Sequence, residues 1–454
     1  MTPPTTQIAF KNNTGSSRAY AYVTGLDINK NYAYAFLQPD GKTVFYPASP
    51  SAPLQPLGMD CAIPMGAPGS TTTVTIPQLA GGRIWFVVDG KLTFFVNPGP
   101  GIVEPSVTNT SDVNYNLKWG FAEFTCLWLT LFLPNNQQQL FVNISYVDFV
   151  SIPISLQLLN TAGKTQTVRG LPANGLEQVC SQLAQQASEN PGWGKLVVKG
   201  PDGRNLRALS PNSGRVGDSS LFNGYYQPFV DQAWSKYANT DLKVDTQADW
   251  GVVTGRVGSN GLMTFPNIGS FAKPSSIDIF SCSTGPFGNY PSETRDVMGA
   301  IGARLAASLN RSTLIANPNQ PDVITGPETD YYKTNPTNHY ARIVHGVNLD
   351  GRGYAFPYDD VAASASTGPD QAGTVYDGSP KLLTVTIGGP DGGPAGGRVP
   401  KGRIPGGKKS VVGGGDNSGN DPDGGEKKKK TKKRFDIPAL LGTITTILKS
   451  LICK

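Results

Sequence analysis

Residues 7–155 alternate apolar and polar side chains in short runs, which is the pattern of half-buried β-strands. The alternation, or an enrichment in β-branched and aromatic residues, marks the stretches QIAFKN, AYAYVTGL, YAYAF, STTTVTIPQL, GRIWFVVDGKLTFFVN and QQLFVNISYVDFVSIPISLQL. Asp89-Gly90, between IWFVV and KLTFFV, predicts a tight hairpin, because primed turns need residues that tolerate positive φ. Short strands separated by frequent turns are typical of an all-β sandwich or barrel.

The pattern changes from about residue 156, where helical spacing appears between the strands. Asn174 and Glu177 have the spacing of a capping box and precede the helical run LEQVCSQLAQQASE. Residues 228–238 and 292–309 read as two further helices. LKVDT, WGVVTGRV and GLMTF predict strands between them, so residues 156–330 are expected to form a mixed α/β domain.

Strand patterns return after about residue 330, in HYARIVHGVNL, GYAFPYDDV and KLLTVTIGG. The simplest architecture is one β domain formed by residues 1–155 and 331–390 and interrupted by the α/β domain. The predicted fold class is therefore β-rich α+β.

Residues 391–454 have a different composition. Residues 391–436 read as a flexible, disordered Gly/Pro-rich linker that contains the basic run KKKKTKKR. Residues 437–454 predict an amphipathic helix with its apolar positions on one face. The combination suits contact with a membrane surface or a protein partner. A solvated charge run, a nuclear-localisation look-alike, or a helix that packs back on the body are the alternatives.

The charge is unevenly distributed, and this argues against a nucleic-acid-binding body. The net charge is +6, but residues 391–454 carry 14 Lys and Arg against 6 Asp and Glu, which leaves the first 390 residues at −2. A basic stripe for nucleic acid should lie on the folded unit. No apolar run reaches the ~20 residues that a membrane-spanning helix needs.

Several kinds of chemistry lack their signatures. The chain has two histidines and no CxxC pair, which argues against a zinc domain, and it contains neither GxxxxGK[ST] nor GxSxG. His339 and His345 are expected on one face of one strand as ordinary β-domain residues. Five cysteines leave room for one or two disulfides with at least one thiol left over. The start MTPPTTQIAF has no apolar stretch after a basic region, so no secretory signal is expected.

Two carboxylates lie within apolar strand patterns, Glu123 in KWGFAEFT and Asp148 in NISYVDFV. Burial of a carboxyl raises its pKa, which is how a general acid is poised near neutral pH. Alternation places Asp148 on the same face as Ile144 and Tyr146. An isolated strand glutamate that points to solvent and a buried structural aspartate are the alternatives.

These motifs carry a family resemblance. KWGFAEFT, LFVNISYVDFVSIPISL, IDIFSCSTGPFG and GRGYAFPYDDV resemble the β-1,3-glucanases of glycoside hydrolase family 64 over roughly residues 5–390. The resemblance implies a thaumatin-like β-sandwich or barrel domain joined to a mixed α/β domain, with a wide groove between them. YAFPYDDV also looks like the terminal portion of thaumatin-like proteins.

The resemblance implies an inverting, endo-acting hydrolase that releases short oligosaccharides, typically laminaripentaose, with no metal or cofactor. Glu123 would be the general acid and Asp148 the general base, separated by roughly 6.5–9.5 Å to admit the attacking water. Thr125 matches a substrate-contacting position and by alternation shares a face with Glu123.

This chain departs from the family pattern in one place. Twenty-four residues separate Glu123 from Asp148, more than in the bacterial enzymes, and the excess is CLWLTLFLPNNQQQ, residues 126–139. It forms either a longer hairpin at the groove rim or a stretch that disrupts the hairpin. Trp119 and Trp128 are the nearest aromatic candidates for sugar stacking, with burial in the core as the alternative.

The sequence therefore predicts a monomeric β-1,3-glucan hydrolase, located outside the cell or in the cell wall. Two alternatives stay open. One is a non-catalytic thaumatin-like protein that binds β-glucan or acts in defence, and the other is a structural protein of the wall or membrane surface held by its basic tail.

Overall fold

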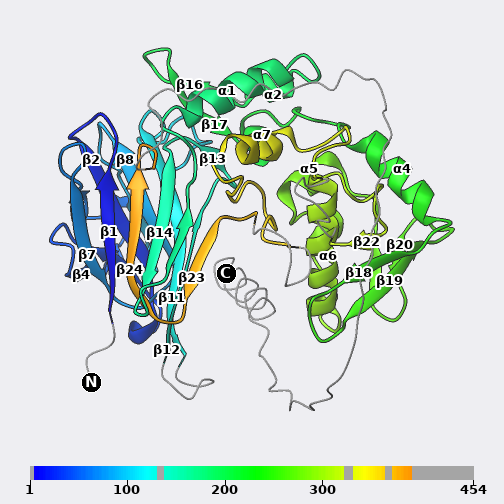
Figure 1. Ribbon diagram of the computed structural model, residues 1–454, viewed down its shortest axis with the longest axis horizontal. Helices are drawn as coiled ribbons and strands as arrows, with labels where there is room; N and C mark the ends of the chain where they lie inside the picture. The colour runs from blue at the N-terminus through cyan, green and yellow to red at the C-terminus, as the bar shows by residue number, and fades with distance from the viewer. Residues whose placement is uncertain (1–4, 130–136, 322–330, 363–370, 391–454) are drawn as a thin grey trace, which may run out of the picture.

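The computed structural model describes residues 5–129, 137–321, 331–362 and 371–390 (Figure 1). The expected linker at 391–436 and helix at 437–454 lie outside the described residues. Within the described ranges no helix is long and apolar enough to cross a membrane.

Two β-sheets pack face to face and form a sandwich (Figure 1). The smaller sheet has the order β15 (Thr165–Val168), β14 (Ile154–Asn160), β24 (Pro380–Ile387), β1 (Thr6–Asn12), β7 (Thr71–Ile76). The larger has the order β23 (Thr374–Asp377), β12 (Gln137–Ile144), β11 (Lys118–Leu129), β8 (Leu79–Val88), β2 (Ala19–Asp27), β3 (Ala33–Leu37), β4 (Val44–Phe45), and β6 (Ile63–Pro64) pairs with β2. Phe10 of β1 and Phe86 of β8 meet between the sheets, with ring centroids 5.7 Å apart.

Strand β24 explains how both ends of the described chain build one sheet. It lies parallel to β1 on one side and antiparallel to β14 on the other. Distant parts of the sequence therefore build one β-sheet. Its first part extends past residue 155, because β14 and β15 belong to the sandwich, and its second part returns with β23 rather than at residue 331.

The predicted hairpin at Asp89-Gly90 is wrong. Asp89 does have a positive φ of 61°. However, β8 already pairs with β2 on one edge and β11 on the other, so no edge is left for the following strand. That strand instead joins a separate small sheet of order β10 (Gly101–Val103), β9 (Phe95–Asn97), β5 (Gln55–Pro56).

The inserted region combines helices with two small sheets. One sheet has the order β13 (Phe149–Val150), β17 (Asn205–Leu209), β16 (Val197–Lys199), and the other β21 (Gly269–Phe271), β20 (Met263–Phe265), β19 (Val252–Val257), β18 (Leu242–Asp245), β22 (Asn319–Gln320). The helices are α1 (Gly175–Gln186), α2 (Gly192–Lys195), α3 (Pro211–Gly217), α4 (Gln227–Tyr237), α5 (Ser276–Ser281), α6 (Arg295–Asn310) and α7 (His339–Val347), with a short 3₁₀ turn at Gly285–Phe287. A second 3₁₀ turn, Ile28–Lys30, joins β2 to β3 in the sandwich.

Helices α1, α4 and α6 and strands β18, β19 and β20 confirm the elements predicted for this region. The capping box before α1 is not formed: the Asn174 side chain makes no cap hydrogen bond and instead accepts one from Nε2 of the Gln178 side chain, at 2.8 Å.

Two predicted strands after residue 330 are wrong. HYARIVHGVNL forms helix α7, which begins after Asn338, whose side chain accepts a hydrogen bond from the Ala341 amide at 3.0 Å. GYAFPYDDV is a loop with a single bridge between Ser145 and Tyr354. The asparagine cap favours the helix at its first turn, and burial of Ile343 and Val344 stabilises it despite their β-branched side chains.

Candidate active site

Glu123 lies in the middle of the larger sheet, on the face that points away from the sandwich core. It is in register with Arg83 of β8 on one side and Asn143 of β12 on the other. Side chains of directly paired residues share a face of the sheet. The neighbouring positions Ala122 and Phe124 are buried in the core, which fixes the outward direction of Glu123.

One end of this outward face is covered by an aromatic cluster. Trp119 and Phe121 of β11 pack against Phe149 of β13, with ring centroids 4.7 Å and 6.0 Å from it. Trp119 is only 2% exposed, so its faces are occupied by protein. The expectation that Trp119 stacks on a sugar is therefore wrong in this structure, and the residue serves the core.

Arg83 links two carboxylates at the uncovered part of the face. Its Nε and Nη2 atoms both lie 3.3 Å from Oε1 of Glu123, and its Nη1 donates to Oε2 of Glu104. The Tyr34 hydroxyl donates to the other Glu104 oxygen at 2.9 Å. Sequence reasoning missed both residues, because strand register brings Arg83 to Glu123 and Glu104 reaches Arg83 from the residue after β10 (Gly101–Val103).

The Arg83 guanidinium is held as a cation. Burial opposes its charge, but the carboxylates of Glu123 and Glu104 outweigh that effect and raise its pKa. The side chains of Arg83, Glu104 and Glu123 remain 30%, 30% and 34% exposed. The group is thus accessible to a ligand from solvent.

Asp148 approaches this group from the segment that leads from the sandwich into the inserted region. It lies in a bend between β12 and β13, so the continuous strand assumed for its alternation with Ile144 and Tyr146 is not present. Its carbonyl accepts a hydrogen bond from the Ser210 amide at 2.9 Å. The next residue, Phe149, packs on Phe121, two residues before Glu123 on the same face.

The surroundings of Asp148 favour its protonated form. Burial raises the pKa of the Asp148 carboxyl, the charges of Glu123 and Glu104 raise it further, and Arg83 opposes them. Asp148 therefore holds its proton to a higher pH than an exposed aspartate does.

The strands that carry Glu123 remain paired beyond it. Strands β11 and β12 stay in register from Ala122 opposite Ile144 to Leu129 opposite Gln137. The described residues of the added stretch, 126–129 and 137–139, therefore continue the two strands and do not disrupt their pairing. Residues 130–136 lie outside the described residues, as does the side chain of Trp128. Thr125 is half-buried on the face of Glu123, as expected, and is paired with Phe141.

A loop at residues 351–361 lies beside the approach to Asp148. The Tyr146 amide donates to the Tyr354 carbonyl at 2.7 Å, and the Tyr354 amide donates to the Ile144 carbonyl at 3.3 Å. The Tyr340 hydroxyl of α7 donates to the Tyr146 carbonyl at 2.7 Å. These contacts fix the chain two residues before Asp148.

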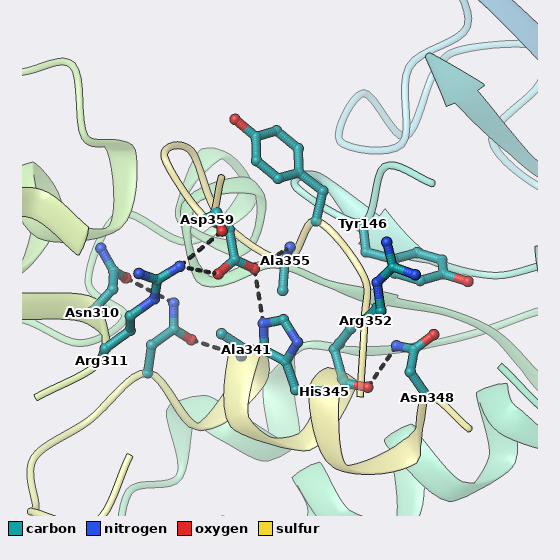
Figure 2. A network of polar contacts seen from close by, with 12 residues as sticks. Tyr146, Asn310, Arg311, Ala341, His345, Asn348, Arg352, Ala355 and Asp359 are labelled. Carbon is teal, nitrogen blue, oxygen red and sulfur yellow. Dashed lines mark hydrogen bonds and ion pairs between the residues drawn. The ribbon is translucent and has the colours of Figure 1, made fainter. Parts of the chain in front are cut away.

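A buried network holds this loop, as Figure 2 shows. Asp359 accepts from Nη2 of Arg311 at 3.0 Å and from the Ala355 amide at 3.0 Å, and its Oδ2 lies 2.8 Å from Nε2 of His345. The other ring nitrogen of His345 lies 2.9 Å from the Gly351 carbonyl.

The two histidines are therefore in a helix and have different partners. His345 belongs to the buried network, whereas Nε2 of His339 lies 3.2 Å from Glu189. In the described part of the chain no group of three or more His, Cys, Asp and Glu residues could hold a metal ion.

An outward-facing carboxylate beside a second, buried carboxylate is the arrangement by which glycoside hydrolases cleave acetals. The comparisons with known proteins agree with this class. The family model described as β-1,3-glucanase, glycoside hydrolase family 64, matches residues 4–387. The chain therefore belongs to glycoside hydrolase family 64.

Similar proteins include two glucan endo-1,3-beta-glucosidases. That of Cellulosimicrobium cellulans is 28% identical over 330 residues, and that of Arthrobacter sp. (strain YCWD3) is 29% identical over 324 residues. Each alignment covers 70% of this chain and 54% of the relative. The chain thus spans about half the length of these curated relatives.

Solved structures are similar over most of the chain. A laminaripentaose-producing beta-1,3-glucanase in complex with laminaritetraose has a TM-score of 0.71 and 31% identity, covering 85% of this chain and 98% of its own. A beta-1,3-glucanase domain from Clostridium beijerinckii has a TM-score of 0.62 at 20% identity, covering 85% and 100%, and supports the fold alone.

Proposed function

We propose that this chain is an endo-acting β-1,3-glucan hydrolase. The observation that carries the proposal is the placement of Glu123 and Arg83 on an uncovered part of the larger sheet, with the buried Asp148 near enough for their charges to act on its carboxyl. Family membership supports the substrate class, as does the similar structure that holds laminaritetraose.

The proposed reaction is a single displacement with inversion. Glu123 gives its proton to the glycosidic oxygen as the bond between that oxygen and the anomeric carbon breaks. Asp148 takes a proton from the water that attacks the anomeric carbon from the opposite face. The reaction needs no metal or organic cofactor. A carboxyl separation of roughly 6.5–9.5 Å stays a prediction.

The surroundings of Asp148 favour the opposite distribution of roles. Burial raises the pKa of the Asp148 carboxyl, which suits a group that donates a proton. Asp148 as the acid and Glu123 as the base is thus a second assignment with a specific observation behind it.

Substrates with different leaving groups separate the two assignments. A dinitrophenyl laminari-oligosaccharide needs little proton donation, so loss of the general acid should leave much of its hydrolysis intact. Azide can replace the activated water, so it should restore turnover only when the general base is lost. If Glu123 is the acid, Glu123→Gln retains hydrolysis of the activated substrate and Asp148→Asn responds to azide. The reverse pattern establishes the second assignment.

The non-catalytic alternative makes a different prediction. A glucan-binding relative would retain laminarin in a pull-down but release no soluble oligosaccharide. Laminarin digestion by the wild-type protein, with Glu123→Gln and Asp148→Asn as matched controls, separates the two functions. Products from the wild type and none from either variant support the hydrolase, whereas binding without products supports the alternative.

The proposal also covers the finer description of the fold and the location. The two-sheet sandwich supports a thaumatin-like β domain. A polysaccharide substrate supports action outside the cell or in the cell wall. The protein is proposed to act as a monomer.

Residues 391–454 are proposed to attach the protein to a surface. Deletion of this segment should lower the fraction that sediments with glucan particles or vesicles and leave laminarin hydrolysis unchanged; unaltered sedimentation would contradict the attachment.

A further inference from the structure

A row of hydrogen-bonded side chains leads from Tyr34 of β3 to Glu123 of β11. The Tyr34 hydroxyl donates to Oε1 of Glu104 at 2.9 Å, and Oε2 of Glu104 accepts from Nη1 of Arg83. Nε and Nη2 of Arg83 lie 3.3 Å from Oε1 of Glu123. Each nitrogen of the guanidinium therefore faces a carboxylate, and Tyr34 stands at the far end of the row.

The aromatic surface beneath Arg83 does not by itself fix the direction of its guanidinium. The Cζ atom of Arg83 lies 4.8 Å from the ring centroid of Phe121 and 5.4 Å from that of Trp85. Stacking on a ring is weakly directional, whereas hydrogen bonds from a guanidinium to carboxylates are directional. The rotation of Arg83 on this surface is therefore set by its two carboxylate partners, and Glu104 is the partner that lies outside the proposed reaction.

Glu104 is held from two sides. Its backbone follows β10 in the small sheet of β10, β9 and β5. Phe94, directly before β9, packs on Trp85 and Phe36 of the larger sheet, with ring centroids 5.7 Å and 5.2 Å away. The Glu104 side chain is 30% exposed, and a glutamate loses considerable rotamer freedom when it is fixed. The Tyr34 hydroxyl supplies the contact that fixes it.

Tyr34 stays a hydrogen-bond donor at every pH at which the protein works. Burial raises the pKa of its hydroxyl, and the charge of Glu104 raises it further. The contact between Tyr34 and Glu104 is thus a permanent one and can serve as an anchor.

The held row leaves one oxygen of Glu123 available. Both contacts from Arg83 go to Oε1, and among the described residues Oε2 of Glu123 makes no hydrogen bond. A group that gives or takes a proton must lie within hydrogen-bond reach of the reacting atom, and a misplacement of about 1 Å can cost about 10²-fold in rate. The orientation of Glu123 therefore depends on the position of Arg83.

We propose that Tyr34 and Glu104 are positioning residues, which hold Arg83 so that Glu123 presents its second oxygen to the reacting atoms. The proposal rests on the proposed function, which it deepens by naming the residues that orient one of the two carboxyl groups. Glu104 acts through Arg83, and Tyr34 acts through Glu104. The role is the same whether Glu123 is the acid or the base.

The test compares kcat and KM for laminarihexaose in Tyr34→Phe, in Glu104→Gln and in the double variant, each at its own pH optimum. Tyr46→Phe is the matched control, because the Tyr46 hydroxyl also donates to a carboxylate, Oδ2 of Asp27, at 2.6 Å. Asp27 is paired with Ala33, the residue before Tyr34, so this contact lies on the opposite face of the sheet. Melting temperatures of all variants report any loss of stability.

Tyr34→Phe should lower kcat about 5- to 50-fold and change KM less than about 2-fold, because an interaction that orients the reacting group contributes to the transition state. Glu104→Gln should lower kcat at least as much. The double variant should be no slower than Glu104→Gln alone, because Tyr34 acts through Glu104. Tyr46→Phe should leave kcat and KM unchanged, even where its melting temperature falls as much as that of Tyr34→Phe.

Three results would overturn the positioning role and leave the proposed function standing. They are an unchanged kcat in Tyr34→Phe, a raised KM at unchanged kcat, and effects of the two substitutions that multiply in the double variant. An equal fall of kcat in Tyr34→Phe and Tyr46→Phe would assign Tyr34 to stability and also overturn the role. A wild type that does not cleave laminarin or laminarihexaose would overturn the proposed function itself.

Discussion

Arg83 and Glu123 lie directly opposite each other on neighbouring strands, and their side chains meet at 3.3 Å. Because Arg83 also contacts Glu104, a single cation balances both of these outward carboxylates. It also partly offsets their effect on Asp148. The charges on this sheet face therefore act on the pKa of Asp148 in opposite directions.

Substitutions of Arg83 and Glu104 should move the pH profile in opposite directions. Arg83→Gln removes a charge that lowers the pKa of Asp148, so that pKa should rise; Glu104→Gln removes a charge that raises it, so that pKa should fall. If Asp148 is the base, the acidic limb of kcat/KM shifts to higher pH in the first variant and to lower pH in the second.

The measurement is kcat/KM for a soluble laminari-oligosaccharide across the pH range. Movement of the basic limb in place of the acidic one would identify Asp148 as the acid. Shifts of the same sign in both variants would contradict the electrostatic description of the site.

Asp148→Asn should separate activity from stability. Loss of either catalytic carboxyl should lower kcat by about 10²- to 10⁴-fold. The raised pKa of Asp148 means that the folded state binds its proton more tightly than the unfolded state, so ionisation at higher pH costs stability. The variant should therefore melt at a higher temperature than the wild type at neutral pH, and the gain should vanish at acidic pH. A lower melting temperature at neutral pH would contradict this sign.

The buried network around Asp359 should be essential for the fold of the loop beside the site. Arg311 is 2% exposed, so Asp359→Ala leaves its charge buried without the carboxylate and should cost about 3–5 kcal/mol of unfolding free energy. Burial opposes ionisation of Asp359, but His345 and Arg311 outweigh it and lower its pKa. Its stabilisation is therefore present at neutral pH and is lost as the pH falls through the folded-state pKa.

Denaturant unfolding at neutral and acidic pH checks this prediction. The difference between wild type and Asp359→Ala should be largest at neutral pH and smaller in acid. A difference below 1 kcal/mol at neutral pH, a threshold of roughly one ordinary hydrogen bond, would show that the network is dispensable.

Truncation of Trp119 should affect stability and not substrate binding. Trp119→Ala removes a buried ring from the aromatic cluster and should cost about 3–5 kcal/mol of unfolding free energy. Trp119→Phe should keep most of that stability, with the KM for glucan unchanged. A raised KM for Trp119→Phe at full stability would restore Trp119 as a sugar contact.

The sequence predicted the sandwich because alternation is a local signal. Strands β11 and β12 alternate buried and outward residues over five or more positions, at 122–126 and 139–144, and the core face is read directly from them. Glu123 stands out in such a strand as an outward carboxylate between buried apolar neighbours. The extension of the hairpin after Thr125 was visible as added residues, but only the register shows that it stays paired.

The remaining features depend on tertiary structure. Asp89-Gly90 has the residue types of a hairpin turn, but β8 pairs with β11 on one edge and with β2 on the other, so the strand after the turn cannot pair with β8. The β-branched residues of helix α7 favoured a strand in the sequence analysis, although Asn338 is a typical N-cap residue and indicated the start of a helix. Arg83 and Glu104 are distant from Glu123 in sequence, and no local pattern marks a partner supplied by strand pairing or by a loop.

The most direct test of the proposed reaction is the stereochemistry of glucan cleavage. Proton NMR during the first minutes of laminarihexaose hydrolysis distinguishes the anomers before they equilibrate. Single displacement at a β-linkage predicts that the wild type releases the α-anomer first and that Glu123→Gln and Asp148→Asn release neither anomer at a comparable rate. Initial release of the β-anomer, or undiminished cleavage by either variant, would contradict the two-carboxylate inverting mechanism.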